Sequence, residues 1–108
     1  MLTGLPRTFG ALADPTRLAI VGRLSHGEAT MGELAAPHRI TPPAITKHVG
    51  VLVDAGLVSR RRVGRTVVCA LRPEAISEVE QWLGDLTSYW NRTVDRLEEL
   101  LREDHDGH

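Results

Sequence analysis

The 108-residue sequence predicts a mainly α-helical protein with one small β-hairpin and a long C-terminal helix. Three observations predict this fold class. Short amphipathic segments up to residue 54 are separated by Gly and Pro, which end helices. Two β-branched runs then flank a Gly-Arg pair at 64–65. A continuous apolar stripe of helical period follows Pro73.

Two helices are expected in the first quarter of the chain. A short helix covers about 6–13, and a second helix begins at Pro15. Asp14 is a favourable N-cap, and Pro15 falls in the first turn, where its missing N–H breaks no helical hydrogen bond. The inward face of the second helix is expected to consist of its aliphatic residues, Leu18, Ile20, Val21 and Leu24.

A third and a fourth helix follow, and each begins with a recognisable cap. Thr30 and Glu33 have the spacing of a capping box, and Pro37 limits the third helix to about two turns. Thr41 is the expected N-cap of the fourth helix. The two prolines after Thr41 are tolerated because the first N–H groups of a helix have no intrahelical partners.

The fourth helix has two different faces. Its residues Ile45, Val49 and Leu52 follow the i, i+4, i+7 spacing of a buried stripe. The opposite side is small and polar with one cation, so it can approach another surface closely. That side carries Pro43, Thr46, Lys47 and Gly50.

The two β-branched runs predict a strongly basic hairpin. Arg60, Arg61 and Arg62 lie in its first arm, and Arg65 lies at its tip. Strand alternation places Arg60 and Arg62 on one face and Arg61 on the other. A charged hairpin can simply protect a sheet edge, but four arginines within six positions favour a functional role.

Apolar residues recur at spacings of three and four along the last helix. Within a single domain of 1–108, we expect a core at 6–73, this helix at 74–103 and a tail at 104–108. A stripe of this length exceeds what one small domain covers, so the helix is expected to form a dimer. The alternative is that the helix folds back on its own core, and the early turns can do so while later turns dimerise. The expected dimer residues are Ile76, Val79, Leu83, Leu86, Trp90 and Leu97.

Charge is distributed unevenly along the chain. Residues 1–73 contain ten Lys or Arg and four Asp or Glu, a net charge of +6. Residues 74–108 contain three Lys or Arg and ten Asp or Glu, a net charge of −7, so the net charge of the whole chain is −1. A basic globular part can present a positive face to phosphate despite the nearly neutral total. The alternative is a solvated acidic helix beside a slightly basic domain.

The order of the predicted elements is that of a winged helix-turn-helix. The stretches LADPTRLAIVGRL, ATMGELA and TPPAITKHVGVLVDAGLVSRRRVGRTVVCALRP also resemble the ArsR family of bacterial transcriptional repressors. This resemblance covers about 11–73 and implies a sequence-specific DNA-binding regulator, a repressor that binds an inverted repeat. Its partners would be double-stranded DNA and a second copy of the chain, with a small-molecule or protein effector left open. The alternative is a winged-helix protein-interaction module that does not bind DNA.

The resemblance also implies which residues bind DNA. The fourth helix would enter the major groove, where Thr46 and Lys47 can reach bases or phosphates. The wing arginines would contact the backbone or the minor groove. For His48 a phosphate contact or a hydrogen bond between helices is favoured over base readout, and Arg17 can equally pair with an acid. The complete expected set is Thr16, Arg17, Thr41, Pro43, Thr46, Lys47, His48, Arg61, Arg62 and Arg65.

The metal ligands of many ArsR relatives are missing from this sequence. Thr30 and Gly32 stand where one family site has a Cys-x-Cys pair, and the Asp/His site of the last helix has no histidine between His48 and His105. No metal site and no cofactor are therefore expected, and the Asp/His-rich end at 104–108 is interpreted as a disordered tail. The strand position of Cys69 favours a buried thiol over a redox sensor.

Catalysis and membrane insertion are not expected. The sequence contains no nucleophile-and-base pattern and no phosphate loop, so an enzyme is not predicted. One cysteine cannot form an internal disulfide, no apolar run is long enough to span a bilayer, and the N-terminus lacks a signal-peptide core. These features predict a cytoplasmic protein.

Overall fold

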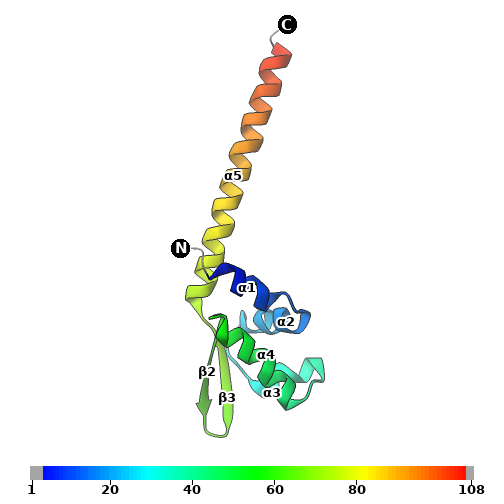
Figure 1. Cartoon of the computed structure of the whole chain (residues 1–108), viewed down its shortest axis with the longest axis vertical. Coiled ribbons are helices and arrows are strands. Elements are labelled where there is room, and N and C mark those ends of the chain that lie inside the picture. The colour runs from blue at the N-terminus through cyan, green and yellow to red at the C-terminus, as the bar shows by residue number, and fades with distance from the viewer. Residues whose placement is uncertain (1–3, 107–108) are drawn as a thin grey trace. The chain divides into compact units, whose positions relative to one another are not determined.

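The computed structural model describes residues 4–106, which form six helices and three strands (Figure 1). The chain divides into two compact units, with the boundary after Glu78 in the last helix. The elements in order are α1 (Leu5–Leu12), α2 (Pro15–Leu24), β1 (Ala29–Thr30), α3 (Met31–Ala35), the 3-10 turn η1 (Ala36–His38), α4 (Pro42–Asp54), β2 (Val58–Val63), β3 (Thr66–Leu71) and α5 (Pro73–Asp106). The predicted fold class, a mainly α-helical winged helix-turn-helix, is confirmed.

The three predicted caps start their helices. The Asp14 carboxylate accepts the backbone N–H three residues further on, at 3.0 Å. Thr30 and Glu33 form the reciprocal capping box, with N···O distances of 3.1 and 2.9 Å. The Thr41 hydroxyl accepts the N–H of Ala44 at 3.3 Å. Because these bonds satisfy N–H groups that have no helical partner, the caps fix where α2, α3 and α4 begin.

The sheet has three antiparallel strands in the order β1-β3-β2, rather than the two that the sequence predicts. The β2–β3 hairpin, called the wing below, turns at Gly64, whose φ of 63° suits glycine. The additional strand β1 pairs Ala29 with Cys69 and Thr30 with Val68. Two residues are too few for an alternating pattern, so β1 could not be recognised before its partner strand was placed.

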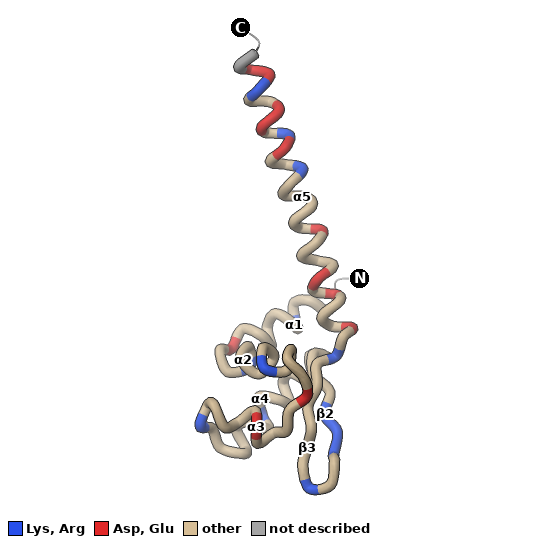
Figure 2. The backbone as a smooth tube through the Cα atoms, turned by 180° about the vertical axis from the view of Figure 1, so that it is seen from behind, with Lys and Arg blue, Asp and Glu red and all other residues tan. Residues whose placement is uncertain are grey.

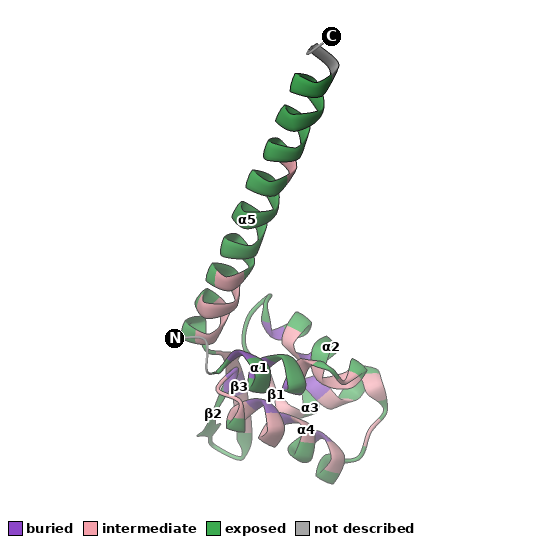
Figure 3. Cartoon of the chain, turned by 45° about the horizontal axis from the view of Figure 1, so that its top comes forward, coloured by how far each residue is buried: buried purple, intermediate pink, exposed green. Residues whose placement is uncertain are grey.

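The core of residues 4–78 lies between the helices and one face of the sheet (Figure 3). The predicted inward residues of α4 are confirmed as buried, and Ala75 and Ile76 at the start of α5 pack against the same cluster. Ile76 therefore has a structural role in its own chain. The most deeply buried side chains are Ile20, Leu34, Val49, Leu52, Leu57, Val58 and Cys69.

The prediction that Leu18 faces inward is wrong. Its side chain is 55% exposed, whereas Ile20 is 1% exposed and Leu24 is 4% exposed. On a helix that turns by about 100° per residue, Leu18 lies about 120° from the centre of the face that Ile20, Val21 and Leu24 form. Leu18 therefore belongs to the surface of α2 even though its spacing to Val21 is helical.

Helix α5 extends past the expected end at 103 and runs from Pro73 to Asp106. The predicted tail is therefore helical at 104–106, and residues 107–108 lie outside the described residues. No Gly or Pro occurs between 85 and 106 to end the helix earlier. No helix in the described part of the chain is long and apolar enough to cross a membrane.

The unit after Glu78 exposes a row of large apolar side chains. Trp90 is 63% exposed and Leu97 is 57% exposed. Val79 at the start of this unit is half-buried. The other exposed apolar residues of the row are Leu83, Leu86, Tyr89, Leu100 and Leu101.

Candidate nucleic-acid interface

The outer face of α4 offers an exposed, polar surface. Pro43, Thr46 and Lys47 are all exposed, on the side of the helix away from the buried stripe. Lys47 makes no ion pair with any described residue, so its ammonium group is available to a ligand. The Thr46 hydroxyl donates a hydrogen bond to the Pro42 carbonyl at 2.9 Å, which leaves its oxygen as an acceptor and its methyl group free.

The turn between η1 and α4 places this helix against α3. Arg39 adopts a left-handed conformation with φ of 53°, which is uncommon for a residue other than glycine. Its side chain is exposed and lies two residues before the Thr41 cap. Arg39 is thus an exposed cation beside α4 that was not among the residues expected to bind DNA. In the sequence, this turn is marked by the short interval between Pro37, which limits the third helix, and Thr41, which caps the fourth.

His48 faces the start of α2 rather than the outer face of α4. Its side chain is 24% exposed, and its Nδ1 lies 3.8 Å from the Asp14 carboxylate. The same nitrogen is buried and has no hydrogen-bond partner among the described residues. The structure therefore brings His48 and Asp14 together without a hydrogen bond, and a phosphate contact or an interhelix hydrogen bond by His48 stays a prediction.

Two hydrogen bonds hold Arg17, one to the cap of α2 and one to α1. Its backbone N–H donates to the Asp14 carboxylate at 3.0 Å, and its Nε donates to the Ala11 carbonyl at 2.7 Å. The first of these bonds lowers the pKa of Asp14, and the positive charge of Arg17 acts in the same direction. Thr16 and Arg17 are both half-buried. Arg17 thus ties α1 to α2, and its Nη groups are left for a further partner.

The wing arginines fall into two groups. Arg61 forms a bidentate ion pair with Glu28, at 2.6 and 3.1 Å. Arg60, Arg62 and Arg65 are exposed and form no ion pair with any described residue. Figure 2 shows the basic positions on β2 and at the tip of the hairpin. Three of the four predicted wing cations are therefore free for an anionic ligand.

The Glu28–Arg61 pair alters the titration of both groups. Hydrogen bonds from Arg61, and then its charge, hold the pKa of Glu28 below its ordinary value of 4.5. The same contact raises the pKa of Arg61. Glu28 could not be identified from the sequence, because nothing local marks a residue whose partner lies 33 residues further along the chain.

Cys69 is confirmed as a buried thiol. It is fully buried on β3, and its Sγ lies 3.8 Å from the Met31 Sδ. Burial raises the pKa of this thiol, although the charge of Arg60 opposes the shift. Among the described residues, no group of three His, Cys, Asp or Glu side chains is placed to hold a metal ion.

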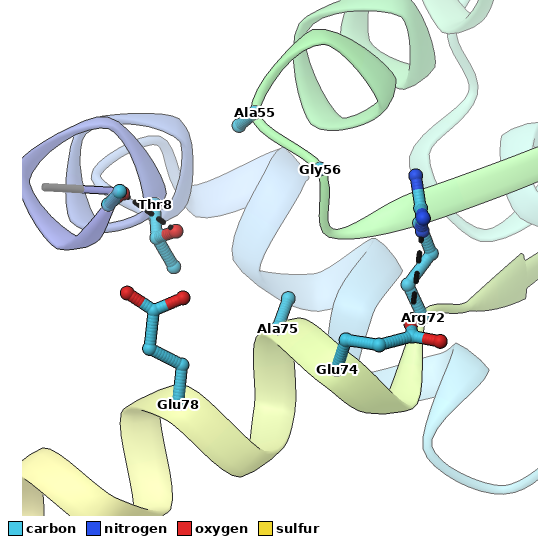
Figure 4. A pocket seen from close by; sticks show the side chains of 8 residues that line it. Thr8, Ala55, Gly56, Arg72, Glu74, Ala75 and Glu78 are labelled. Carbon is cyan, nitrogen blue, oxygen red and sulfur yellow. Dashed lines mark hydrogen bonds and ion pairs between the residues drawn. The ribbon is translucent and has the colours of Figure 1, made fainter. Parts of the chain in front are cut away.

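A separate pocket of about 230 Å³ lies where α1, the end of α4 and the start of α5 meet (Figure 4). The Glu78 carboxylate points toward Thr8, whose hydroxyl donates to the Gly4 carbonyl at 3.0 Å. Arg72 and Glu74 form a 3.8 Å ion pair beside it. With one carboxylate unpaired and one ion pair exposed, this pocket lacks the basic character of the α4 and wing surfaces.

A family model and several known transcriptional regulators match this chain. A family model described as a helix-turn-helix domain matches residues 12–61. The HTH-type transcriptional regulator Rv2034 of Mycobacterium tuberculosis is 37% identical over 100 residues, which cover 93% of this chain and 91% of that protein. The transcriptional repressor SdpR of Bacillus subtilis is 31% identical over 75 residues, which cover 69% of this chain and 83% of that protein.

A solved structure shows the same likeness in three dimensions. The crystal structure of an ArsR family transcriptional regulator, RHA00566, superposes with a TM-score of 0.75 and 41% sequence identity. The superposition covers 84% of this chain and 94% of that protein. The family-model match at 12–61 includes both α3 and α4.

Proposed function

Since this chain belongs to the ArsR family of helix-turn-helix transcriptional regulators, we propose that it represses transcription as a homodimer bound to an inverted repeat in double-stranded DNA. That it is a DNA-binding regulator follows from the family. Repression is supported by the relative SdpR, which is named a transcriptional repressor. The protein would act in the cytoplasm, where the DNA is located.

The observation that carries this proposal is the outer face of α4. A major groove admits one α-helix, and residues in the first turns of that helix reach the base edges. Thr46 and Lys47 are exposed in the first two turns of α4, opposite its buried stripe. We assign base contacts to these two residues, and close approach to the backbone to Thr41 and Pro43.

Contacts to the DNA backbone are assigned to residues beside α4. Arg65 at the wing tip and Arg62 on β2 are exposed cations without a protein partner among the described residues. Thr16 and Arg17 lie at the start of α2, where Asp14 already accepts the Arg17 backbone N–H, so we assign the phosphate contact to the Arg17 guanidinium and the Thr16 hydroxyl. Phosphate contacts position the protein without reading sequence.

Dimerisation is assigned to the later turns of α5. The exposed side chains of Leu83, Leu86, Trp90 and Leu97 recur at spacings of three, four and seven, and so lie on one side of the helix. A second copy of the same helix would cover them. Two α4 helices related by a twofold axis would then meet half-sites about 34 Å apart, one turn of DNA. Sedimentation of the purified protein should give the mass of a dimer.

The test is selection of fragmented genomic DNA by the purified protein, with and without a chelator, followed by sequencing. One inverted repeat with half-sites about ten base pairs apart should be enriched. The chelator should leave this enrichment unchanged if no metal is needed for binding. Absence of any enriched fragment, even at low salt where phosphate contacts are strongest, would contradict the proposal.

A further inference from the structure

The ion pair between Glu28 and Arg61 connects the residue before β1 to β2, a strand that is not the neighbour of β1 in the sheet. Arg61 on β2 lies directly opposite Val68 on β3, and Val68 lies opposite Thr30 on β1. Directly opposed residues point to the same face, and Glu28 stands two residues before Thr30. Two strand spacings, about 10 Å, separate β1 from β2. The two long side chains therefore reach toward each other across the outer face of β3.

Beyond the backbone pairing of β2 with β3 and of β3 with β1, the side chains of β2 do little to hold the wing in place. Only Val58 at the start of β2 is buried, and the next five residues of the strand are exposed. A two-stranded hairpin is marginally stable by itself. No other side chain of β2 makes a hydrogen bond or ion pair in the described part of the chain. The pair with Glu28 is thus the side-chain link between the outer part of the wing and β1.

This pairing also limits what Arg61 can do on DNA. Its guanidinium uses one N–H of each Nη group for the carboxylate, and the carboxylate cancels its charge. A phosphate would have to replace Glu28 or bind beside a negative charge. Arg60 and Arg62 point to the opposite face of the strand and have no such competitor.

We propose that Arg61 is a positioning residue, which with Glu28 fixes the wing on the three-stranded sheet so that Arg62 and Arg65 meet the DNA. The assignment rests on the proposed DNA binding. It replaces the expectation that Arg61 itself contacts DNA. Both members of the pair should then support DNA binding, although one of them is an acid that phosphate repels.

The test is a double-mutant cycle of Glu28→Ala and Arg61→Ala, together with the exchanged pair E28R/R61E. Binding is measured over a range of salt concentrations, both to the inverted repeat selected above and to a mixed-sequence duplex. Each single variant should weaken binding to the repeat about two- to fivefold, because this fold-change corresponds to the usual free-energy contribution of an exposed ion pair. The double variant should be no weaker than either, and the exchanged pair should recover most of the loss.

The salt dependence separates positioning from direct contact. Arg61→Ala should leave the slope of log K against log salt unchanged, because no phosphate contact is lost. The matched control Arg62→Ala removes one cation from the same strand and should reduce the slope by about 0.9. The proposal is overturned if Arg61→Ala reduces the slope as Arg62→Ala does and Glu28→Ala strengthens binding. Unchanged affinity in both single variants would also overturn it.

Hydrogen exchange of the unbound protein gives a readout that does not need DNA. Glu28→Ala and Arg61→Ala should both speed exchange of the β2 and β3 amides, and Arg62→Ala should not. If the wild-type protein binds neither duplex, the proposed function fails, while the exchange rates still decide whether the pair fixes the wing. Equal exchange in all variants would show that it does not.

Discussion

Helix α4 and the wing both present cations to solvent, but they hold those cations in different ways. The direction of Lys47 follows from the cap at Thr41 and from the buried stripe on the other side of the same helix. Arg61 is held by Glu28, which is 33 residues away in the sequence. The direction of a side chain can therefore be predicted from the sequence when its own helix or strand fixes it, as α4 does for Lys47. A long-range partner gives no such local signal.

The largest effect should come from the inner face of α4, which supports its outer face. Leu52 is fully buried, so Leu52→Ala should lower the free energy of unfolding by about 2–5 kcal/mol. Urea denaturation at neutral pH measures this change. Lys47→Ala is the matched control on the exposed side, and it should change stability by less than about 0.5 kcal/mol. Equal losses of stability would show that α4 does not have the two faces described.

The next effect concerns binding by the outer face. Lys47→Ala should weaken binding to the selected repeat by about 1–3 kcal/mol, because a base contact is lost. Binding to a mixed-sequence duplex should weaken less. Arg7→Ala serves as the control, since it removes an exposed cation from α1. Competition titrations with both duplexes give the ratio of the affinity for the repeat to the affinity for the mixed-sequence duplex. If Lys47→Ala leaves this ratio unchanged, base readout by Lys47 is contradicted.

A smaller effect is expected at the wing tip. Arg65→Ala should weaken binding to the repeat and to the mixed-sequence duplex by the same factor, because a phosphate contact carries no sequence information. The slope of log K against log salt should fall by about 0.9. Titrations at several salt concentrations measure both quantities. If Lys47→Ala and Arg65→Ala lose specific and nonspecific binding in the same proportion, the assignment of base contacts to α4 and phosphate contacts to the wing is wrong.

The smallest effect is the contribution of the wing pair to acid stability. The pKa of Glu28 is lower in the folded protein than its ordinary value of 4.5, because Arg61 donates to the carboxylate. The stabilisation is therefore fully present above pH 4.5 and is lost as the pH falls through the lower, folded-state pKa. Urea midpoints measured from about pH 6 down to about pH 3 should decline less steeply in Glu28→Gln than in the wild type. A parallel decline in the two proteins would contradict this linkage.

Much of the fold could be predicted because its signals are local. Asp14, Thr30 and Thr41 cap helices through the residues that follow each of them within one turn. The turn at Gly64 is likewise set by the conformation of one residue. The family resemblance then indicated the outer face of α4 and the wing as the expected DNA-binding surface, and the named relatives support a DNA-binding regulator.

The features that could not be predicted depend on contacts between distant segments. Strand β1 exists because Ala29 and Thr30 meet β3, and the Glu28–Arg61 pair depends on that same arrangement. His48 was placed at the border of the buried face, but its neighbour Asp14 caps another helix. The assignment of Leu18 failed for a different reason, since helical spacing to one buried residue does not fix the centre of the buried face.

Under the proposed function, the hydrogen bond from the Thr46 hydroxyl to the Pro42 carbonyl would limit which base pairs suit the start of α4. A threonine whose proton is already donated can accept from an amino group and can touch a methyl group, but it cannot donate to the O6 and N7 acceptors of guanine. An adenine–thymine pair offers both an amino group and a methyl group in the major groove. We therefore expect an A·T pair opposite Thr46 in each half of the repeat. The operator sequence at that position would then follow from one side-chain hydrogen bond.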